Sequence, residues 1–339
     1  MIYYFQIQIG IGFVESDQTV MGDKRGGYAM SIIVIGAAFV DIKGFPDDIY
    51  LPTGRNVGRI EFVHGGVARN VVEDIANVEL RPTYLGMVDD SPMGADVLQK
   101  LKKHKVNCDY VLTRPDGMGT WLAVFDNNGD VAGSISKRVN LMPLVEMMEE
   151  KGDEIFCNAM SVIVQVDLDK EIIKKVLELA AKHQVKTYAL VSNMSIAVHR
   201  RDFLQKFDCF ICNQGEAGIL FMDDYEGKSP EEMQDILSER VVRARIPSMV
   251  VTMGGEGAVY ADCNGNKGYC PARKVQVKDT TGAGDAFCAG LVIGLTYGKT
   301  MPEAIEIGAQ LAASVITSSE NVCPRFLPEE LGLDVEVTW

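Results

Sequence analysis

Several large classes of protein need residues that this sequence has in short supply. Its 339 residues include four histidines, none of them in a His-x-x-x-His spacing, which excludes the common helical zinc site. Basic residues are the minority, because 33 Lys and Arg face 47 Asp and Glu, for a net charge of -14. Binding to nucleic acid or to an anionic membrane needs a positive surface that displaces counterions. We therefore expect a small-molecule ligand, with neither nucleic acid nor membrane as a partner.

Long apolar runs and a disulfide pattern are also missing. No apolar run approaches the ~20 residues of a membrane-spanning helix. Residues 1–14 are apolar, but they lack the basic region and the cleavage site of a signal peptide. We expect residues 1–29 to be a leader or extension outside the fold and 30–339 to form one domain. The eight cysteines have no disulfide rhythm, and Cys209 and Cys212 lie in an apolar run, which indicates buried thiols and a reducing, cytoplasmic setting.

Short β-rich runs alternate with amphipathic stretches along most of the chain. This alternation predicts an α/β fold with a mostly parallel central sheet that is flanked by helices. Helix starts are marked by two capping boxes, Ser229 to Glu232 and Thr300 to Glu303, and residues 169–183 carry one apolar face. The predicted strands are residues 31–36, 83–86, 154–157, 186–190, 209–212 and 249–252.

Two stretches interrupt this rhythm. Residues 59–63 read as a strand, and residues 121–125 and 131–135 read as a hairpin around an Asn-Gly turn. We expect strands from about 41–64 and 114–137 to form a small β-sheet lid over the carboxyl edge of the main sheet, where ligands of open α/β folds bind. Ordinary surface hairpins are the alternative.

Two familiar phosphate-binding loops are absent. A dinucleotide fingerprint needs Gly-x-Gly-x-x-Gly after the first strand, and residues 36–39 supply no second glycine. Residues 294–300 resemble a Walker A loop but are one residue short between the glycines, so we interpret them as a loop between helices.

A different glycine turn carries the predicted chemistry. Residues 279–285 lead from a strand into a helix that is rich in small residues, and Gly282 and Gly284 allow the backbone to turn sharply. The amides of Gly282, Ala283 and Gly284 then form an anion site at the helix N-terminus, with Asp285 beside it. A carboxylate there suits a general base for phosphoryl transfer. A capped helix with a favourable N-terminal charge is the structural alternative.

The candidate acceptor site combines another glycine pair with two polar residues. Gly65 and Gly66 precede a helix that begins near Asn70, whose amide can bind a sugar hydroxyl. Asp41 follows the first strand and could accept two neighbouring hydroxyls. A plain helix start and a solvated loop carboxylate are the alternatives.

Two later segments suit a nucleotide with its metal. Asn213 and Glu216 follow a strand and could hold Mg²⁺ through water, since this ion keeps much of its hydration shell. A glycine loop ends the next strand and could lie along phosphates. Its candidate nucleotide-binding residues, together with Asn213, are Thr252, Gly254, Gly255 and Gly257.

Together these segments resemble the ribokinase-like (PfkB-type) carbohydrate kinase family from about residue 31 to residue 324. The runs at 279–287 and 65–70 are similar to the two signatures of that family, and Asn213 with Glu216 matches its metal segment. The resemblance implies a ribokinase-like α/β core with a β lid, Mg²⁺ and ATP, and a sugar or nucleoside acceptor. It also implies a monovalent-cation (K⁺) site at Asp279 and Thr281.

Within the family, residues 40–44, 65–70 and 318–324 most resemble pseudouridine kinases. The resemblance implies that Asp285 accepts the proton of a ribosyl 5'-hydroxyl, most simply that of pseudouridine, while Asp41 and Asn70 hold the ribose. Adenosine, ribose or fructose are alternative acceptors, a silent ligand sensor is an alternative class, and a homodimer through the lid is expected.

Overall fold

An eight-stranded sheet forms the centre of the computed structural model, which describes residues 31–335. Six neighbouring strands run parallel, and the two strands at one edge are added through antiparallel pairings. In spatial order the strands are β14 (Lys267–Cys270), β13 (Ala258–Asp262), β12 (Ser248–Thr252), β11 (Cys209–Asn213), β10 (Lys186–Leu190), β9 (Ala159–Gln165), β1 (Ser31–Ile35) and β4 (Thr83–Leu85).

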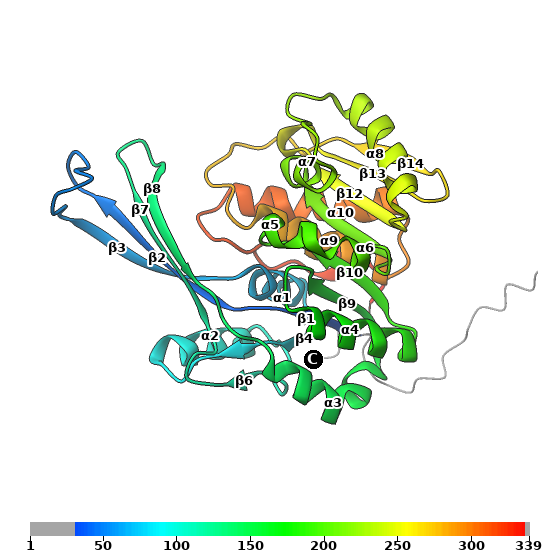
Figure 1. Ribbon diagram of the computed structural model, residues 1–339, viewed down its shortest axis with the longest axis horizontal. Coiled ribbons are helices and arrows are strands. Elements are labelled where there is room, and N and C mark those ends of the chain that lie inside the picture. Colours follow the sequence, from blue (N-terminus) through cyan, green and yellow to red (C-terminus); the bar gives the residue numbers. More distant parts are fainter. Residues whose placement is uncertain (1–30, 336–339) are drawn as a thin grey trace, which may run out of the picture.

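Helices cover both faces of this sheet, as a parallel sheet requires (Figure 1). Alternate residues of β1 point to opposite sides, so that Ile32 and Val34 belong to one apolar core and Ile33 and Ile35 to the other. The helices that pack with the first core are α1 (Val67–Asn77), α2 (Pro92–Lys103), α9 (Ala283–Thr296) and α10 (Met301–Ile316). Those that pack with the second are α3 (Pro143–Phe156), α4 (Lys170–His183), α5 (Met194–Ala197), α6 (Arg201–Leu204), α7 (Gln214–Phe221) and α8 (Pro230–Ala244).

Small residues allow α9 and α10 to approach closely. A Cβ atom placed on Gly290 of α9 would lie 2.7 Å from the Cα of Gly308 in α10. The many small residues of α9 therefore serve packing, as the sequence indicates, and they fix the position of the N-terminus of this helix.

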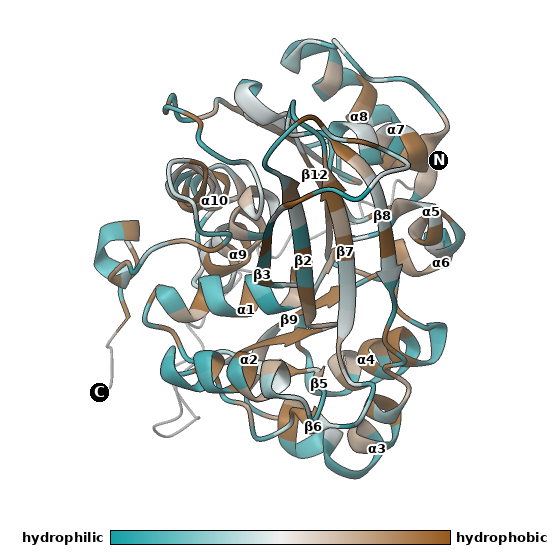
Figure 2. Ribbon diagram, turned by 90° about the vertical axis from the view of Figure 1, so that its left-hand side faces the viewer, coloured by the Kyte–Doolittle hydropathy of each residue, from teal (hydrophilic) through white to brown (hydrophobic). Residues whose placement is uncertain are grey.

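A separate four-stranded sheet projects from the body of the protein, and we call it the small sheet (Figure 1). Its order is β3 (Gly58–Gly65), β2 (Phe39–Pro46), β7 (Gly119–Phe125) and β8 (Val131–Lys137). Strand β2 follows β1 almost directly, so the small sheet leaves the main sheet beside its edge strand β4. Gly129 has φ +85° in the turn between β7 and β8. In Figure 2 the small sheet lies in front of the main sheet.

One strand predicted for the main sheet is wrong. Residues 154–157 were predicted to be extended, but they form the last turn of α3 and its C-cap, and the strand is β9, a few residues later. The apolar residues of α3 recur at helical spacing, with Leu144, Met148, Ile155 and Phe156 buried. A short apolar run of this kind does not by itself distinguish a strand from the buried end of a helix.

The other predicted elements are confirmed. Strands form at 31–35, 83–85, 186–190, 209–213 and 248–252, and both predicted capping boxes are present at the starts of α8 and α10. Cys209 and Cys212 are buried free thiols.

The remaining short elements are β5 (Met87–Val88), β6 (Leu112–Thr113), and the 3-10 helices η1 (Val198–Arg200), η2 (Gly254–Glu256) and η3 (Pro328–Leu331). Within 31–335 no helix is both long enough and apolar enough to cross a bilayer. The predicted leader, 1–29, lies outside the described residues.

Candidate active site

The predicted site residues gather where the parallel strands end. Asn213 and Thr252 are direct neighbours in the register of β11 and β12, so the two predicted nucleotide segments lie side by side. The N-terminus of α9 and the start of the small sheet reach the same edge. Carboxyl ends of parallel strands are the usual ligand edge of such folds.

The turn into α9 can be made only by glycine. Gly282 is the N-cap with φ +82°, and a Cβ atom there would lie 2.0 Å from the carbonyl oxygen of Asn321. The Ala283 amide donates to the Thr280 carbonyl over 3.2 Å, so this turn already uses one of the three predicted anion-binding amides. The amide of Gly284 belongs to the first turn, which has no intrahelical acceptor, and the residue is exposed.

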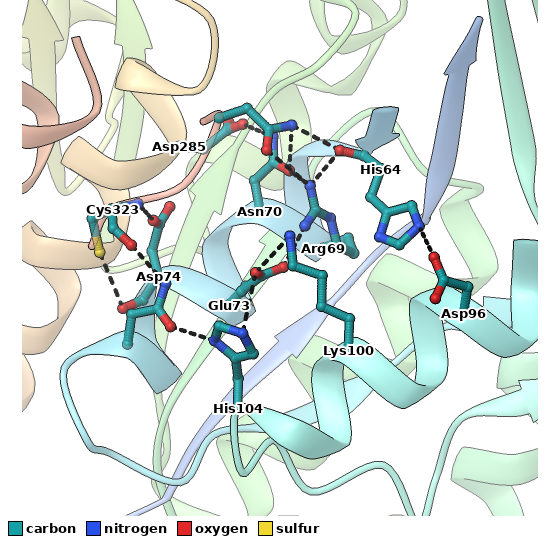
Figure 3. Close-up of polar contacts among 12 residues, drawn as sticks. His64, Arg69, Asn70, Glu73, Asp74, Asp96, Lys100, His104, Asp285 and Cys323 are labelled. Carbon is teal, nitrogen blue, oxygen red and sulfur yellow. Dashed lines mark hydrogen bonds and ion pairs between the residues drawn. The ribbon is translucent and has the colours of Figure 1, made fainter. Parts of the chain in front are cut away.

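Asp285 lies one residue further and contacts α1. Its Oδ2 accepts a hydrogen bond from Nδ2 of Asn70 over 2.7 Å (Figure 3). Burial of the carboxyl group raises the pKa of Asp285 to about 7, and the negative charge of Glu216 adds to this. The hydrogen bond from Asn70 and the charge of Arg69 act in the opposite direction. A carboxyl group with this pKa can exchange a proton near neutral pH.

The amide oxygen of Asn70 has two donors of its own. Arg69 donates to Oδ1, and Nδ2 of Asn321 approaches the same atom at 3.4 Å. Since both lone pairs are used, Asn70 has only its second N–H left for a ligand. From the sequence alone, the Asn70 amide could meet a ligand either as a donor or as an acceptor.

The two glycines before α1 serve different purposes. A Cβ atom on Gly65 would lie 2.7 Å from either carboxylate oxygen of Asp41, so Gly65 leaves room for that side chain. Gly66 has φ +96° and packs against the carbonyl oxygen of Ala37. Asp41 itself is part of β2 in the small sheet, and its partial burial raises the pKa of its carboxyl group.

Asn213 and Glu216 form a capping box at the start of α7. Each side chain accepts the backbone N–H of the other over 2.8 Å. This leaves one carboxylate oxygen of Glu216 without a role in the cap. Burial raises the pKa of Glu216, and the nearby charge of Asp167 raises it further.

Asp167 was missed at the sequence level. It follows β9, is nearly buried, and accepts hydrogen bonds from the amide and hydroxyl of Ser192 over 3.0 and 2.8 Å. The signal was present, since a carboxylate after an apolar strand marks this edge, but the misplaced strand at 154–157 hid it. Within residues 31–335, no three His, Cys, Asp or Glu side chains converge on one point as direct metal ligands.

Most of the remaining predicted residues are exposed. Gly254 and Gly255 are exposed with free space around them, and Gly257 has φ +112° against the carbonyl oxygen of Cys270. Asp279 and Thr281 are exposed, and Oδ1 of Asp279 accepts the Thr281 amide over 2.8 Å, which lowers the pKa of Asp279. This turn joins neither Asp285 nor Glu216 through a hydrogen bond.

Comparison with known proteins agrees with this geometry. Residues 29–323 match the model of the pfkB family of carbohydrate kinases. The chain belongs to this family. It is 35% identical over 292 residues to guanosine-inosine kinase of Exiguobacterium acetylicum, covering 86% of this chain and 95% of that protein. It is 25% identical over 291 residues to pseudouridine kinase of Escherichia coli (strain K12), covering 85% and 91%.

Solved structures of kinases share the fold. Ribokinase of Arabidopsis thaliana, complexed with ribose and ATP, superposes with a TM-score of 0.79 at 20% identity, covering 90% of this chain and 99% of that one. Adenosine kinase of Sinorhizobium meliloti gives 0.70 at 22% identity, covering 87% and 96%. The predicted ribokinase-like fold is confirmed. As a pfkB family member the protein is a carbohydrate or nucleoside kinase, and the family implies use of ATP with a metal.

Proposed function

We propose that this kinase transfers the γ-phosphoryl group of ATP to the 5'-hydroxyl of a ribonucleoside, with Asp285 as the base. One observation carries this proposal: a carboxyl group with a pKa of about 7 lies in the first turn of α9 and is held by Asn70. Asp285 takes the proton of the hydroxyl as its oxygen attacks phosphorus. The Gly284 amide and the dipole of α9 stabilise the charge on the transferring group.

The acceptor proposed first is a purine nucleoside, guanosine or inosine. The relative with this activity is 35% identical across 95% of its length, whereas the pseudouridine kinase is 25% identical. Pseudouridine, which the sequence motifs favour, is the second acceptor.

Asp41 and Asn70 are the proposed ribose contacts, and their chemistry is complementary. Asp41 is an acceptor and binds hydroxyl hydrogens. Asn70 has only an N–H left, so the hydroxyl that it binds must accept. A pair of vicinal ribose hydroxyls satisfies both, because each hydroxyl can donate and accept.

The nucleotide is proposed to lie along β11 and β12. Gly254 and Gly255 are open to a ligand, while Thr252 and Gly257 hold the loop beside Asn213. Glu216 fits a hydrated Mg²⁺, because its oxygen outside the capping box is left on the ligand edge and no cage of direct ligands is required. Bound there, the ion would neutralise phosphate charge. Asp279 and Thr281 are the proposed contacts of a monovalent cation.

The small sheet is proposed to act as a lid, with one face turned to the site. Asp41 and Lys43 share one face of this sheet. The charge of Lys43 lowers the pKa of Asp279, which supports a face turned toward the loop before α9. Closure of such a sheet would exclude water from the reacting groups.

The opposite face of the small sheet is proposed to bind a second copy of the chain. Phe62, Leu122 and Ile135 lie in one cross-strand row with Ile42, and they are 59%, 42% and 71% exposed. Apolar rows of this kind mark contact surfaces. A dimer in solution that Phe62→Ser converts to a monomer would support this, and a wild-type monomer at all concentrations would contradict it.

The eight free thiols suit the reducing, cytoplasmic setting that the sequence predicts.

The test is a panel of acceptors with ATP and Mg²⁺: guanosine, inosine, pseudouridine, uridine, adenosine, ribose and fructose. The proposal expects the highest kcat/KM for guanosine or inosine, with phosphate found on the 5' oxygen. Preference for a free sugar would contradict the nucleoside assignment. Tight binding of a nucleoside without turnover would instead indicate a ligand sensor.

A further inference from the structure

Arg69 is a buried cation directly behind the catalytic edge. Its side chain is 1% exposed, although it comes only three residues after Gly66. Burial of a guanidinium group is costly unless several partners accept its hydrogen bonds. The sequence analysis assigns no role to Arg69, so the partners of its side chain indicate what it does.

Those partners come from three segments of the chain (Figure 3). The guanidinium group forms an ion pair with Glu73, one turn further along α1, and donates to the carbonyl oxygen of His64 at the end of β3. It also donates to Oδ1 of Asn70 and lies 3.3 Å from Oδ1 of Asn321, in the segment after α10. Glu73 is fully buried and compensates the charge.

We propose that Arg69 is a positioning residue: its guanidinium group fixes the Asn70 amide so that Nδ2, and not Oδ1, faces Asp285. The reason is electrostatic. A reversed amide would place its NH₂ group against the donors of Arg69 and Asn321, and its oxygen against the carboxylate of Asp285. Both contacts would be repulsive. Because Arg69 holds Oδ1 of Asn70, it is Nδ2 that meets Asp285.

Arg69 also acts on the base through its charge. The charged or titratable groups around Asp285 are Arg69 and Asp74 from α1, Glu216 from α7 and Cys288 on α9 itself. Arg69 is the cation among them. It therefore opposes the burial and the negative charges that hold the proton on Asp285, and favours the ionised form that catalysis needs.

This inference rests on the proposed role of Asp285, and a set of three variants tests it. Arg69→Gln removes both the set of guanidinium N–H donors and the positive charge. Arg69→Lys keeps the charge but loses the guanidinium geometry, and Lys100→Gln is the control. Lys100 reaches Glu73 at 3.2 Å from the outer side and, among residues 31–335, forms no hydrogen bond or ion pair with Asn70. The readouts are kcat, KM and the pH profile of kcat/KM with the best acceptor.

For Arg69→Gln we expect kcat to fall roughly 10- to 100-fold, as for other groups that orient a functional residue. The acidic limb of its kcat/KM profile should move up by about one pH unit, because an opposite charge has been lost. Arg69→Lys should have a lower kcat, while the acidic limb of its kcat/KM profile stays at the wild-type pH. Lys100→Gln should match the wild type in both. An unmoved limb in Arg69→Gln, with the same kcat as Lys100→Gln, would overturn the proposal.

The experiment also covers an Arg69→Gln variant that does not fold. If Arg69→Gln lacks the near-UV circular dichroism of the wild type, Arg69→Lys decides: at unchanged Tm, a tenfold or greater loss of kcat supports the proposal, and a kcat within twofold overturns it. Asp285→Ala separates the two claims. Normal turnover in that variant would refute the proposed function itself, whereas an inactive Asp285→Ala beside unaffected Arg69 variants would refute only the role of Arg69.

Discussion

Asn70 donates a hydrogen bond to Asp285 over 2.7 Å, although the two residues are 215 positions apart in the chain. This contact joins the first turn of α1 to the first turn of α9, two helices that pack against each other on the same face of the sheet. A glycine-linked turn precedes each helix. The two family signatures are therefore parts of one site, and the hydrogen bond is where they meet.

Loss of the carboxylate should abolish most of the activity. We expect Asp285→Asn to lower kcat by roughly 10²- to 10⁴-fold, the usual contribution of a general base, with a smaller change in KM. Steady-state kinetics with guanosine or inosine measure this. Asp235→Asn is the matched control, since that exposed aspartate lies in α8 and forms an ion pair with Lys267. A kcat above one tenth of the wild-type value in Asp285→Asn would refute the assignment.

The pH profile should report the raised pKa of Asp285. The base must be ionised to accept a proton, so kcat/KM should rise with pH and level off above a pKa of about 7. Asn70→Ala removes a hydrogen bond that favours the ionised form, and the limb should then move to higher pH. A limb near pH 4, the ordinary value for an aspartate, would show that burial does not govern this group.

Two glycines of the same turn should respond differently to alanine. Gly282→Ala places a Cβ atom 2.0 Å from the Asn321 carbonyl oxygen at φ +82°, and we expect a loss of several kcal/mol in the free energy of unfolding. Gly284→Ala meets nothing within 4 Å and lies in a helix, so its unfolding free energy should change by less than about 1 kcal/mol. Urea denaturation measures both. Equal losses in the two variants would contradict the geometry.

Asp74 should make the protein less stable at high pH. Complete burial raises the pKa of Asp74 well above its ordinary value, with further contributions from Asp285 and Glu73. The folded state then binds this proton more tightly than the unfolded state does. The stabilisation is complete below the unfolded pKa and is lost as pH rises through the folded pKa.

Asp74→Asn keeps an oxygen for the Cys323 amide, which Oδ1 of Asp74 accepts over 2.6 Å, and removes the titration. We therefore expect its Tm to fall less between pH 5 and pH 9 than the Tm of the wild type. The exposed pair of Asp116 and Lys137 has the opposite sign, since Asp116 has a lowered pKa, and Asp116→Asn should leave the pH dependence almost unchanged. Parallel Tm curves for Asp74→Asn and wild type would contradict the prediction.

Features that depend on residues close together in the chain were predictable. The capping boxes of α8 and α10, the turn at Gly282 and the Asn-Gly hairpin each need only a few consecutive residues, and the structure contains all of them. The strand expected at 154–157 failed for the same reason, because a run of only three apolar residues, Ile155 to Cys157, suits a strand and the end of a helix equally well.

Asn213 and Glu216 show how far a local motif reaches. Their spacing is that of a capping box, and the structure forms one, so this part of their role is complete within four residues. The negative charge that acts on the Glu216 carboxyl group comes from Asp167, in the segment after β9, and Glu216 in turn acts on Asp285 in α9. The motif alone contains neither.

The sequence by itself determined the alternating α/β architecture and the glycine turn before α9, since each follows from periodicity or from neighbouring residues. The proposal of Asp285 as the base came from that turn together with the family resemblance. Only the tertiary structure decided that the pKa of Asp285 is about 7, that Asn70 presents its N–H to it, and that Arg69 stands behind that amide. These properties arise from burial and from charges contributed by distant segments. Desolvation and Coulomb interactions depend on distance in space, and folding alone sets those distances.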